Sequence, residues 1–212
     1  MSSRDLEGAL ALTGAEACRA YYRDWAERYD AGFAAEMDYL LPAHVAAAFQ
    51  AAGGQGPVLD IGAGTGLLAE RLREMGFAGE IDAVDFSPEM LRQAGQKGIY
   101  RLLMQADITK PLPLAPQYRG VVSSGTFTAG HVGPEALSVL LAVARPGAQF
   151  ALSVNHRVWR AAGFDTALAA LEAAGRVAAL QVIEVQVYGA AALAQDARHA
   201  EDRAQVVLFQ TT

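Results

Sequence analysis

The sequence has little cysteine and no excess of positive charge, and both shortages exclude classes of protein. Cys18 is the single cysteine among 212 residues, so neither an intramolecular disulfide nor a cysteine cluster for zinc or iron–sulfur can form. Lys and Arg number 17 against 23 Asp and Glu, giving a net charge of -6, and the basic residues are scattered. Proteins bind nucleic acid and anionic membranes through clustered positive charge, so we expect neither as a partner.

Long apolar runs are also missing. No stretch of about 18 residues is apolar and free of charge, as a membrane-spanning helix requires. The segment from Met1 to Gly8 carries charges and does not resemble a signal peptide. Hydrophobic residues make up 52% of the chain and charged residues 19%, which is typical of a globular protein. We therefore expect a cytoplasmic protein with one domain over residues 1–212, and nothing in the sequence indicates its oligomeric state.

The first 55 residues have helical patterns and are expected to form an N-terminal cap. Thr13-Gly14-Ala15-Glu16 has the spacing of a capping box, which opens a helix by satisfying two free backbone amides. Tyr22, Trp25 and Tyr29 follow at helical spacing and share one face, a pattern that is more often core packing than ligand contact. A second helix is predicted from about Glu36 to Ala52, ending at Gly53-Gly54.

From residue 56 onward the pattern alternates between strands and helices. Helices are predicted from Leu67 to Met75, with Met75 turned inward, after Ser87-Pro88-Glu89, and from Pro134 to Ala144. The predicted strands are Val58 to Ile61, Ile81 to Asp85, Tyr100 to Gln105, Gly120 to Ser124 and Gln149 to Val154. Such alternation favours a parallel sheet covered on both faces. The tail differs, because Val177 to Val187 and Gln205 to Phe209 suggest a hairpin with one antiparallel strand.

The strongest chemical signal is a glycine-rich turn, Asp60-Ile61-Gly62-Ala63-Gly64-Thr65-Gly66, between a strand and a helix. Glycine allows a sharp turn and a close approach of ligand to main chain. The dinucleotide pattern needs a glycine at position 67, where Leu67 stands. Asp60 would also repel a pyrophosphate, whereas S-adenosylmethionine (SAM) has no phosphate and carries an ammonium and a sulfonium. The turn therefore favours SAM, with Gly62, Ala63, Gly64, Thr65 and Gly66 as contacts.

Two further acids end the next strands. Asp85 lies 23 positions after Gly62, where a carboxylate can accept both ribose hydroxyls of a nucleoside, and Asp107 can accept the adenine amino group. One acid at a strand end is often an ordinary exposed residue, but three on the carboxyl edge of one sheet favour a ligand site. Neighbouring residues complete the predicted cofactor site, and these are Phe86, Met90, Ala106, Ile108 and Ser124.

These motifs resemble those of class I SAM-dependent methyltransferases over roughly Tyr21 to Val154. Tyr22 to Asp30, Val58 to Gly66, Val84 to Leu91 and Ser123 to Val132 are similar to the methyltransferase-like proteins named after the Williams–Beuren syndrome region. Ala129 departs from the His expected there, so a role for a paired His does not carry over. The resemblance implies a Rossmann-like, seven-stranded, mostly parallel α/β sheet with an antiparallel strand near the C-terminus. It also implies that the first helix closes over the cofactor, with Tyr22 and Tyr29 as contacts.

The catalytic centre is less defined by the sequence. Methyl transfer needs proximity, alignment and exclusion of water, and a thiol or amine acceptor needs no base. His131, after the fourth strand, is the candidate general base, although a histidine at a helix start also pairs with local backbone. His156 and Arg157 are weaker candidates for acceptor contacts.

Absent motifs narrow the acceptor. The segment Ser124-Gly125-Thr126-Phe127 is not the Asn/Asp-Pro-Pro-aromatic tetrad of enzymes that methylate amide or base nitrogens, and it lacks acids for magnesium. We expect metal-independent, in-line methylation of a small molecule. The alternatives are a SAM-binding protein without catalysis, or a nicotinamide-dependent reductase, against which Leu67 and Asp60 argue.

Overall fold

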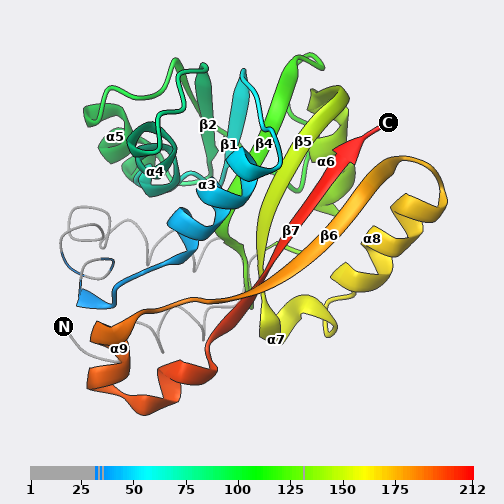
Figure 1. Ribbon diagram of the computed structural model, residues 1–212. Helices are drawn as coiled ribbons and strands as arrows, with labels where there is room; N and C mark the ends of the chain where they lie inside the picture. The colour runs from blue at the N-terminus through cyan, green and yellow to red at the C-terminus, as the bar shows by residue number, and fades with distance from the viewer. Residues whose placement is uncertain (1–31, 33, 35, 131) are drawn as a thin grey trace.

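The computed structural model describes residues 32, 34, 36–130 and 132–212, and its centre is a seven-stranded sheet (Figure 1). The strand order is β3-β2-β1-β4-β5-β7-β6. The five strands β1 to β5 run parallel, and β7 is antiparallel to both β5 and β6. This confirms the predicted seven-stranded, mostly parallel sheet. The strands are β1 (Val58–Ile61), β2 (Ile81–Asp85), β3 (Leu102–Gln105), β4 (Tyr118–Phe127), β5 (Ala144–Asn155), β6 (Val177–Gln186) and β7 (Arg203–Thr211).

Helices cover both faces of the sheet. In Figure 1, α3 crosses in front of the sheet and α6 lies behind it. Side chains of α3 and α4, among them Phe49 and Leu72, form one core with Val58 and Val122. Those of α6 and α8 pack on the other face. The helical elements are α3 (Leu41–Ala51), α4 (Leu67–Glu74), α5 (Pro88–Gln96), α6 (Ala136–Val143), α7 (His156–Trp159), α8 (Phe164–Ala173), α9 (Ala190–Gln195) and the 3₁₀ helix η3 (Ala197–Glu201).

The strand order reverses between β1 and β4, and this point determines where a ligand can enter. The chain builds β1, β2 and β3 outward on one side, then crosses to β4 and β5 on the other. Connections therefore leave the ends of β1 and β4 in opposite directions, and a crevice opens between them. Open α/β sheets bind their ligands at this switch point, outside the carboxyl ends of the strands.

Two expectations about the helices were wrong. The helix predicted from about Glu36 begins at Leu41, because Asp38 has a φ of 48° and Tyr39 forms an isolated bridge with Tyr188. The amide of Leu40 donates to the carbonyl of Val187 at 2.9 Å, which draws this segment toward the end of β6 instead. Met75, expected to face inward, follows the last residue of α4 and is 42% exposed.

The start of α5 has the predicted cap. Ser87 Oγ accepts a hydrogen bond from the amide of Met90 at 3.2 Å, and Pro88 occupies the first turn. Ser87 itself is buried, so the cap lies inside the molecule. It holds the beginning of α5 against the end of β2, where the candidate site is built.

Candidate functional site

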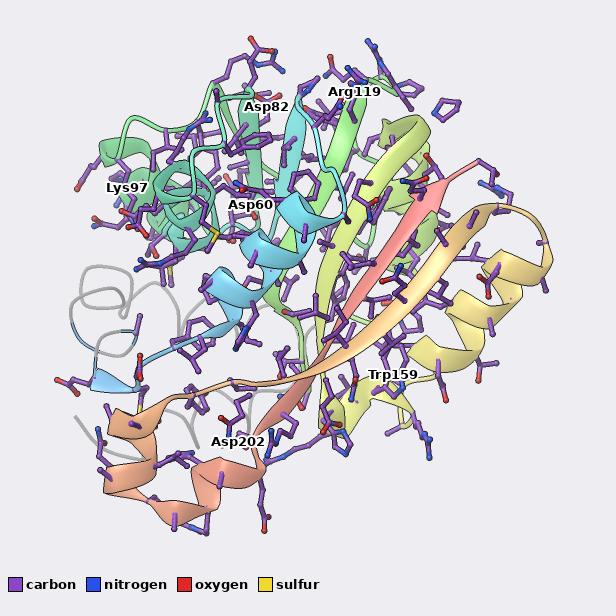
Figure 2. The ribbon with its side chains drawn as sticks, in the orientation of Figure 1. Asp60, Asp82, Lys97, Arg119, Trp159 and Asp202 are labelled. Carbon is purple, nitrogen blue, oxygen red and sulfur yellow. The ribbon has the colours of Figure 1, made fainter. Side chains whose placement is uncertain are left out.

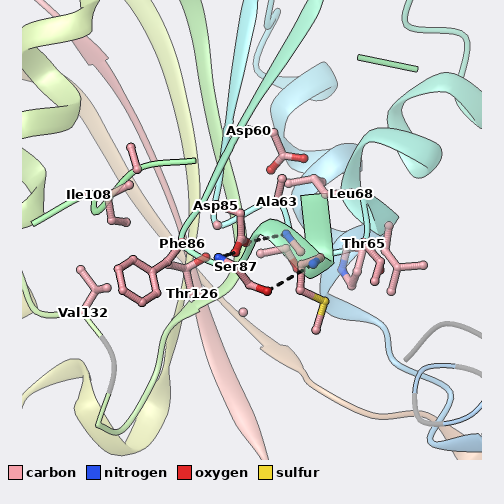
Figure 3. Close-up of a pocket in the computed structure, with 18 of the residues that line it drawn as sticks. Asp60, Ala63, Thr65, Leu68, Asp85, Phe86, Ser87, Ile108, Thr126 and Val132 are labelled. Atoms are coloured by element: carbon pink, nitrogen blue, oxygen red, sulfur yellow. Dashed lines mark hydrogen bonds between the residues drawn. The ribbon is translucent and has the colours of Figure 1, made fainter. Parts of the chain in front are cut away.

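A cavity of about 240 Å³ lies outside the carboxyl ends of the parallel strands (Figure 3). Most of the residues predicted to bind a cofactor line it. They are Asp60, Gly62, Ala63, Gly64, Thr65, Asp85, Phe86, Met90, Ala106, Asp107, Ile108 and Ser124. The fold thus brings together residues from the ends of β1, β2, β3 and β4 at one place.

The glycine turn forms one wall of the cavity. The amides of Gly62 and Ala63 donate to the carbonyl of Val84 at 2.8 and 3.1 Å, which ties the turn to β2. Gly62 has a φ of 63°, and a Cβ there would collide with the Thr126 side chain. Gly64 has a φ of 56°, and a Cβ there would meet no atom within 4 Å. Gly62 therefore allows the turn to pack on β4, while Gly64 presents bare backbone to open space.

Asp85 links the end of β2 to the glycine turn. Its Oδ2 accepts from the amide of Gly64 and its Oδ1 from the amide of Ser87, both at 2.8 Å. Burial raises the pKa of this carboxyl, and the amide hydrogen bonds oppose that rise. Each carboxylate oxygen has a second lone pair, so Asp85 can still accept from a ligand hydroxyl. The backbone bonds fix the carboxylate at the cavity wall.

Asp60 is the most unusual group of the site. Its side chain is only 1% exposed, and its Oδ2 accepts a hydrogen bond from the Tyr100 hydroxyl at 2.7 Å. Its Oδ1 is buried and has no hydrogen-bond partner among the described residues. Burial raises the pKa of Asp60 to about 7, the Tyr100 hydrogen bond opposes the rise, and the charge of Asp85 adds to it. Burying a carboxylate oxygen without a hydrogen-bond donor costs free energy. A ligand that donates a hydrogen bond to this oxygen would offset that cost.

Asp107 lies at the far end of the cavity, two residues beyond β3. Its Oδ1 accepts from the amide and the hydroxyl of Thr109 at 3.0 and 2.6 Å, and its Oδ2 pairs with Lys110 at 3.1 Å. The Thr109 and Lys110 contacts lower its pKa. Phe86 and Ile108 lie nearby in the lining (Figure 3). This end offers apolar surface beside one ionised acceptor.

The fourth strand contributes a wall that the sequence only partly indicated. The hydroxyls of Ser123 and Thr126 donate to the carbonyl of Ile61 at 2.7 and 3.0 Å, and so fasten β4 to the glycine turn. Gly125, with a φ of 80°, lies so close to Tyr39 that a Cβ would be 2.5 Å from its hydroxyl oxygen. Burial raises the pKa of Tyr39 to about 12, so it is a neutral donor in this wall.

Some predicted residues are not in the lining. Gly66 precedes α4, and a Cβ there would approach the ring of Tyr100 at 3.0 Å. Tyr22, Tyr29 and His131, like Cys18 and Trp25, lie outside the described residues. His156 pairs weakly with Glu184 at 3.7 Å, and Arg157 pairs with Asp202 at 3.0 Å, neither of them in the lining.

Several lining residues were not among those predicted to bind the cofactor. They are Tyr39, Pro42, Leu67, Leu68, Ser87, Thr109, Gly125, Thr126 and Val132. The neighbours of predicted residues, such as Leu67 and Thr126, were identifiable from position alone. Tyr39 was not, because it reaches the cavity from the segment before α3 and no local motif marks it.

Two kinds of feature are missing from the described part of the chain. In ranges 36–130 and 132–212, no three His, Cys, Asp or Glu side chains are grouped as a metal site would need. Over the same ranges, no helix is both long and apolar enough to cross a membrane.

Sequence comparison identifies a methyltransferase segment in this chain. Residues 58–147 match the family described as "Methyltransferase domain". The human protein named methyltransferase-like protein 27 is 36% identical over 101 residues, which is 46% of this chain and 40% of that relative. The match thus spans less than half of the relative's length.

Solved structures share the fold across most of the chain. A SAM-dependent methyltransferase of Methanococcus maripaludis superposes with a TM-score of 0.62 and 15% identity, covering 92% of this chain and 93% of that one. The plantazolicin methyltransferase BpumL, solved in complex with S-adenosylhomocysteine (SAH), gives 0.62 and 14%, covering 90% of each chain. Together these findings show a match to a methyltransferase domain over residues 58–147 and a fold shared with solved methyltransferases over most of the chain.

Proposed function

We propose that this chain transfers the methyl group of SAM to a small-molecule acceptor by metal-independent, in-line displacement. The observation that carries the proposal is Asp60, which lines the cavity beside the glycine turn and whose buried Oδ1 is unpartnered among the described residues. A carboxylate there attracts the ammonium and sulfonium of SAM and repels the pyrophosphate of a dinucleotide.

The other acids support the same orientation of the ligand. Asp85 lies between the glycine turn and α5, where it can accept from ribose hydroxyls. Asp107 and the side chains of Phe86 and Ile108 lie where an adenine ring can be covered and its amino group bound. Gly64 leaves room for the ligand beside bare backbone. In this orientation the methionine end of SAM points toward Asp60.

The chain's own contribution to the reaction is positioning. SAM, when bound, supplies an activated methyl group that needs no metal. Asp60 and Asp85 would hold the methionine and ribose parts of the cofactor, and Ser124 to Thr126 form one wall of the cavity. Alignment of acceptor and methyl group in a closed site accelerates transfer without a charged catalytic group. The role of His131 as a general base stays a prediction.

The end of β4 favours a compact acceptor. Gly125 and Thr126 are small, and the hydrogen bonds of Ser123 and Thr126 to Ile61 hold this wall rigid. One structural neighbour, BpumL, is named as the methyltransferase of plantazolicin. We infer a small-molecule acceptor for this chain too, to be identified by its turnover.

The test has a binding part and a turnover part. SAH should raise the melting temperature because it binds the native state alone, and NADH at the same concentration should not. A pool of cell metabolites incubated with SAM should then release SAH in proportion to enzyme. Stabilisation by NADH and none by SAH would refute the proposal. SAH binding without turnover on any acceptor would favour a SAM-binding protein without catalysis.

A further inference from the structure

Tyr100 contacts Asp60 without lining the cavity itself. It stands between α5 and β3, forty positions from Asp60, and its hydroxyl donates to Asp60 Oδ2 at 2.7 Å. The ring packs against a small core of Ala63, Ala83 and Leu91, and Tyr100 is not part of the cavity lining. The hydroxyl of Tyr100 therefore acts on the site through its hydrogen bond to Asp60.

We propose that Tyr100 is a positioning residue, which holds one oxygen of Asp60 so that the other faces the ammonium group of the cofactor. The inference rests on the proposed function and adds a residue to it. With Oδ2 fixed by Tyr100, the rotation of the carboxylate is restricted, and Oδ1 remains buried and unpartnered among the described residues, on a residue that lines the cavity. A preorganised acceptor loses little entropy when the ligand arrives.

The last glycine of the turn has a role in this arrangement. Gly66 has a φ of 91°, and a Cβ there would approach Tyr100 Cε2 at 3.0 Å and its hydroxyl oxygen at 3.3 Å. Any side chain at position 66 would therefore push the Tyr100 ring. The lack of a side chain at Gly66 therefore leaves space for the Tyr100 ring, while the lack of one at Gly64 leaves space for the ligand.

The ionisation of Asp60 depends on the charged groups around it and on the hydrogen bond from Tyr100. Asp85, on β2, disfavours ionisation of Asp60, as does burial. Glu70 on α4 acts on Tyr100 and pairs with Lys97 at 2.6 Å. The hydrogen bond from Tyr100 favours the ionised form and so lowers the pKa of Asp60. Without it, the pKa of Asp60 would rise, and less of the carboxylate would be ionised near neutral pH.

The test compares two ligands that differ in the amino-acid part. SAH carries the ammonium, while 5′-methylthioadenosine has the nucleoside and sulfur but no charge. Affinities of both are measured by calorimetry from about pH 6 to about pH 9. In Tyr100→Phe, SAH affinity at neutral pH should fall about tenfold, since a hydrogen bond to a charged group is lost. Its pH midpoint should move upward, while methylthioadenosine affinity should change less than about twofold.

Tyr118→Phe is the matched control. Tyr118 is a buried tyrosine whose hydroxyl donates to another buried aspartate, Asp82, at 2.8 Å, away from the cavity lining. Its loss should leave the affinity and pH midpoint of both ligands unchanged. As a second variant, Gly66→Ala pushes the Tyr100 ring and should produce the same selective loss for SAH, so the test remains if Tyr100→Phe fails to fold.

The outcomes separate this inference from the proposed function. Equal weakening of both ligands with an unchanged pH midpoint would make Tyr100 a structural residue and overturn the inference. Failure of the wild-type chain to bind either ligand would instead overturn the proposed function. A selective loss of SAH affinity with a raised midpoint supports both.

Discussion

Replacing Asp60 with Asn should stabilise the ligand-free protein at alkaline pH while weakening SAH binding. Asp60 is 1% exposed, and burial raises its pKa to about 7 from 3.8 in the unfolded chain. Between these two values the folded protein binds one more proton than the unfolded chain. Stability therefore falls as pH rises through this window, by about 1.4 kcal/mol per pH unit.

The magnitude follows from the same two values. At about pH 8 the ionised Asp60 costs roughly 4 kcal/mol, and at about pH 5 roughly 1.5 kcal/mol. Asn is neutral and its oxygen can still accept from Tyr100, but its amide group leaves a buried donor without a partner, at about 1–3 kcal/mol. The net gain of Asp60→Asn at about pH 8 is thus roughly 1–3 kcal/mol, and the advantage should shrink by about 3 kcal/mol at pH 5.

Urea unfolding at the two pH values measures this difference directly. A control is Asp82→Asn, since Asp82 is also 1% exposed but accepts from Tyr118 and from Arg101, whose Nε–Oδ1 distance is 2.9 Å. Removing that charge takes one of two carboxylates from Arg101, which also pairs with Glu80, so this variant should lose stability at about pH 8, where Asp60→Asn gains it. An equal effect of Asp60→Asn at both pH values would refute the titration argument.

Two further predictions concern the cofactor site. Asp85→Ala should reduce SAH affinity by roughly 30- to 150-fold, because acceptors for the ribose hydroxyls are lost, and calorimetry with unchanged affinity would place the ribose elsewhere. Gly64→Ala and Gly62→Ala both add a Cβ at positive φ, but only the Gly62 methyl collides with Thr126. Melting temperature should therefore fall more for Gly62→Ala, and Gly64→Ala should retain its fold while losing SAH affinity; the opposite order would contradict the assigned roles of the two glycines.

The sheet was predictable where each strand had clear boundaries. The predicted β1 and β2 agree with Val58–Ile61 and Ile81–Asp85, since a glycine or serine follows each strand within two residues. The strands β4 and β5 are longer than predicted, as Tyr118–Phe127 and Ala144–Asn155. Arg119 is charged and Pro146 has no amide to donate, so the sequence did not predict that the strands extend over these residues. Pairing with neighbouring strands overrides such local preferences.

The residues of the candidate site were predictable where a local sequence motif marks them. Acids at strand ends and glycines in the turn were found because their positions follow from the local pattern. Tyr39 and Tyr100 were missed because each contacts the site from a segment distant in sequence. Tyr100 is forty residues from Asp60, and its approach depends on how α5 and β3 pack against β2. A sequence pattern with a period of two or 3.6 residues predicts local secondary structure and does not predict contacts between distant segments.

A comparison of Asp60 with Asp82 explains why we propose a cationic ligand for the site. Both are buried to the same degree, lie on adjacent strands and accept a hydrogen bond from a tyrosine (Figure 2). Asp82 also has Arg101, whereas the Oδ1 of Asp60 has no hydrogen-bond partner in the described part of the chain. A buried carboxylate needs a cation or a proton to offset desolvation. Burial raises the pKa of Asp60 to about 7, so a proton offsets the desolvation as the pH falls below this value, and the ammonium of SAM is the group that we expect to replace that proton.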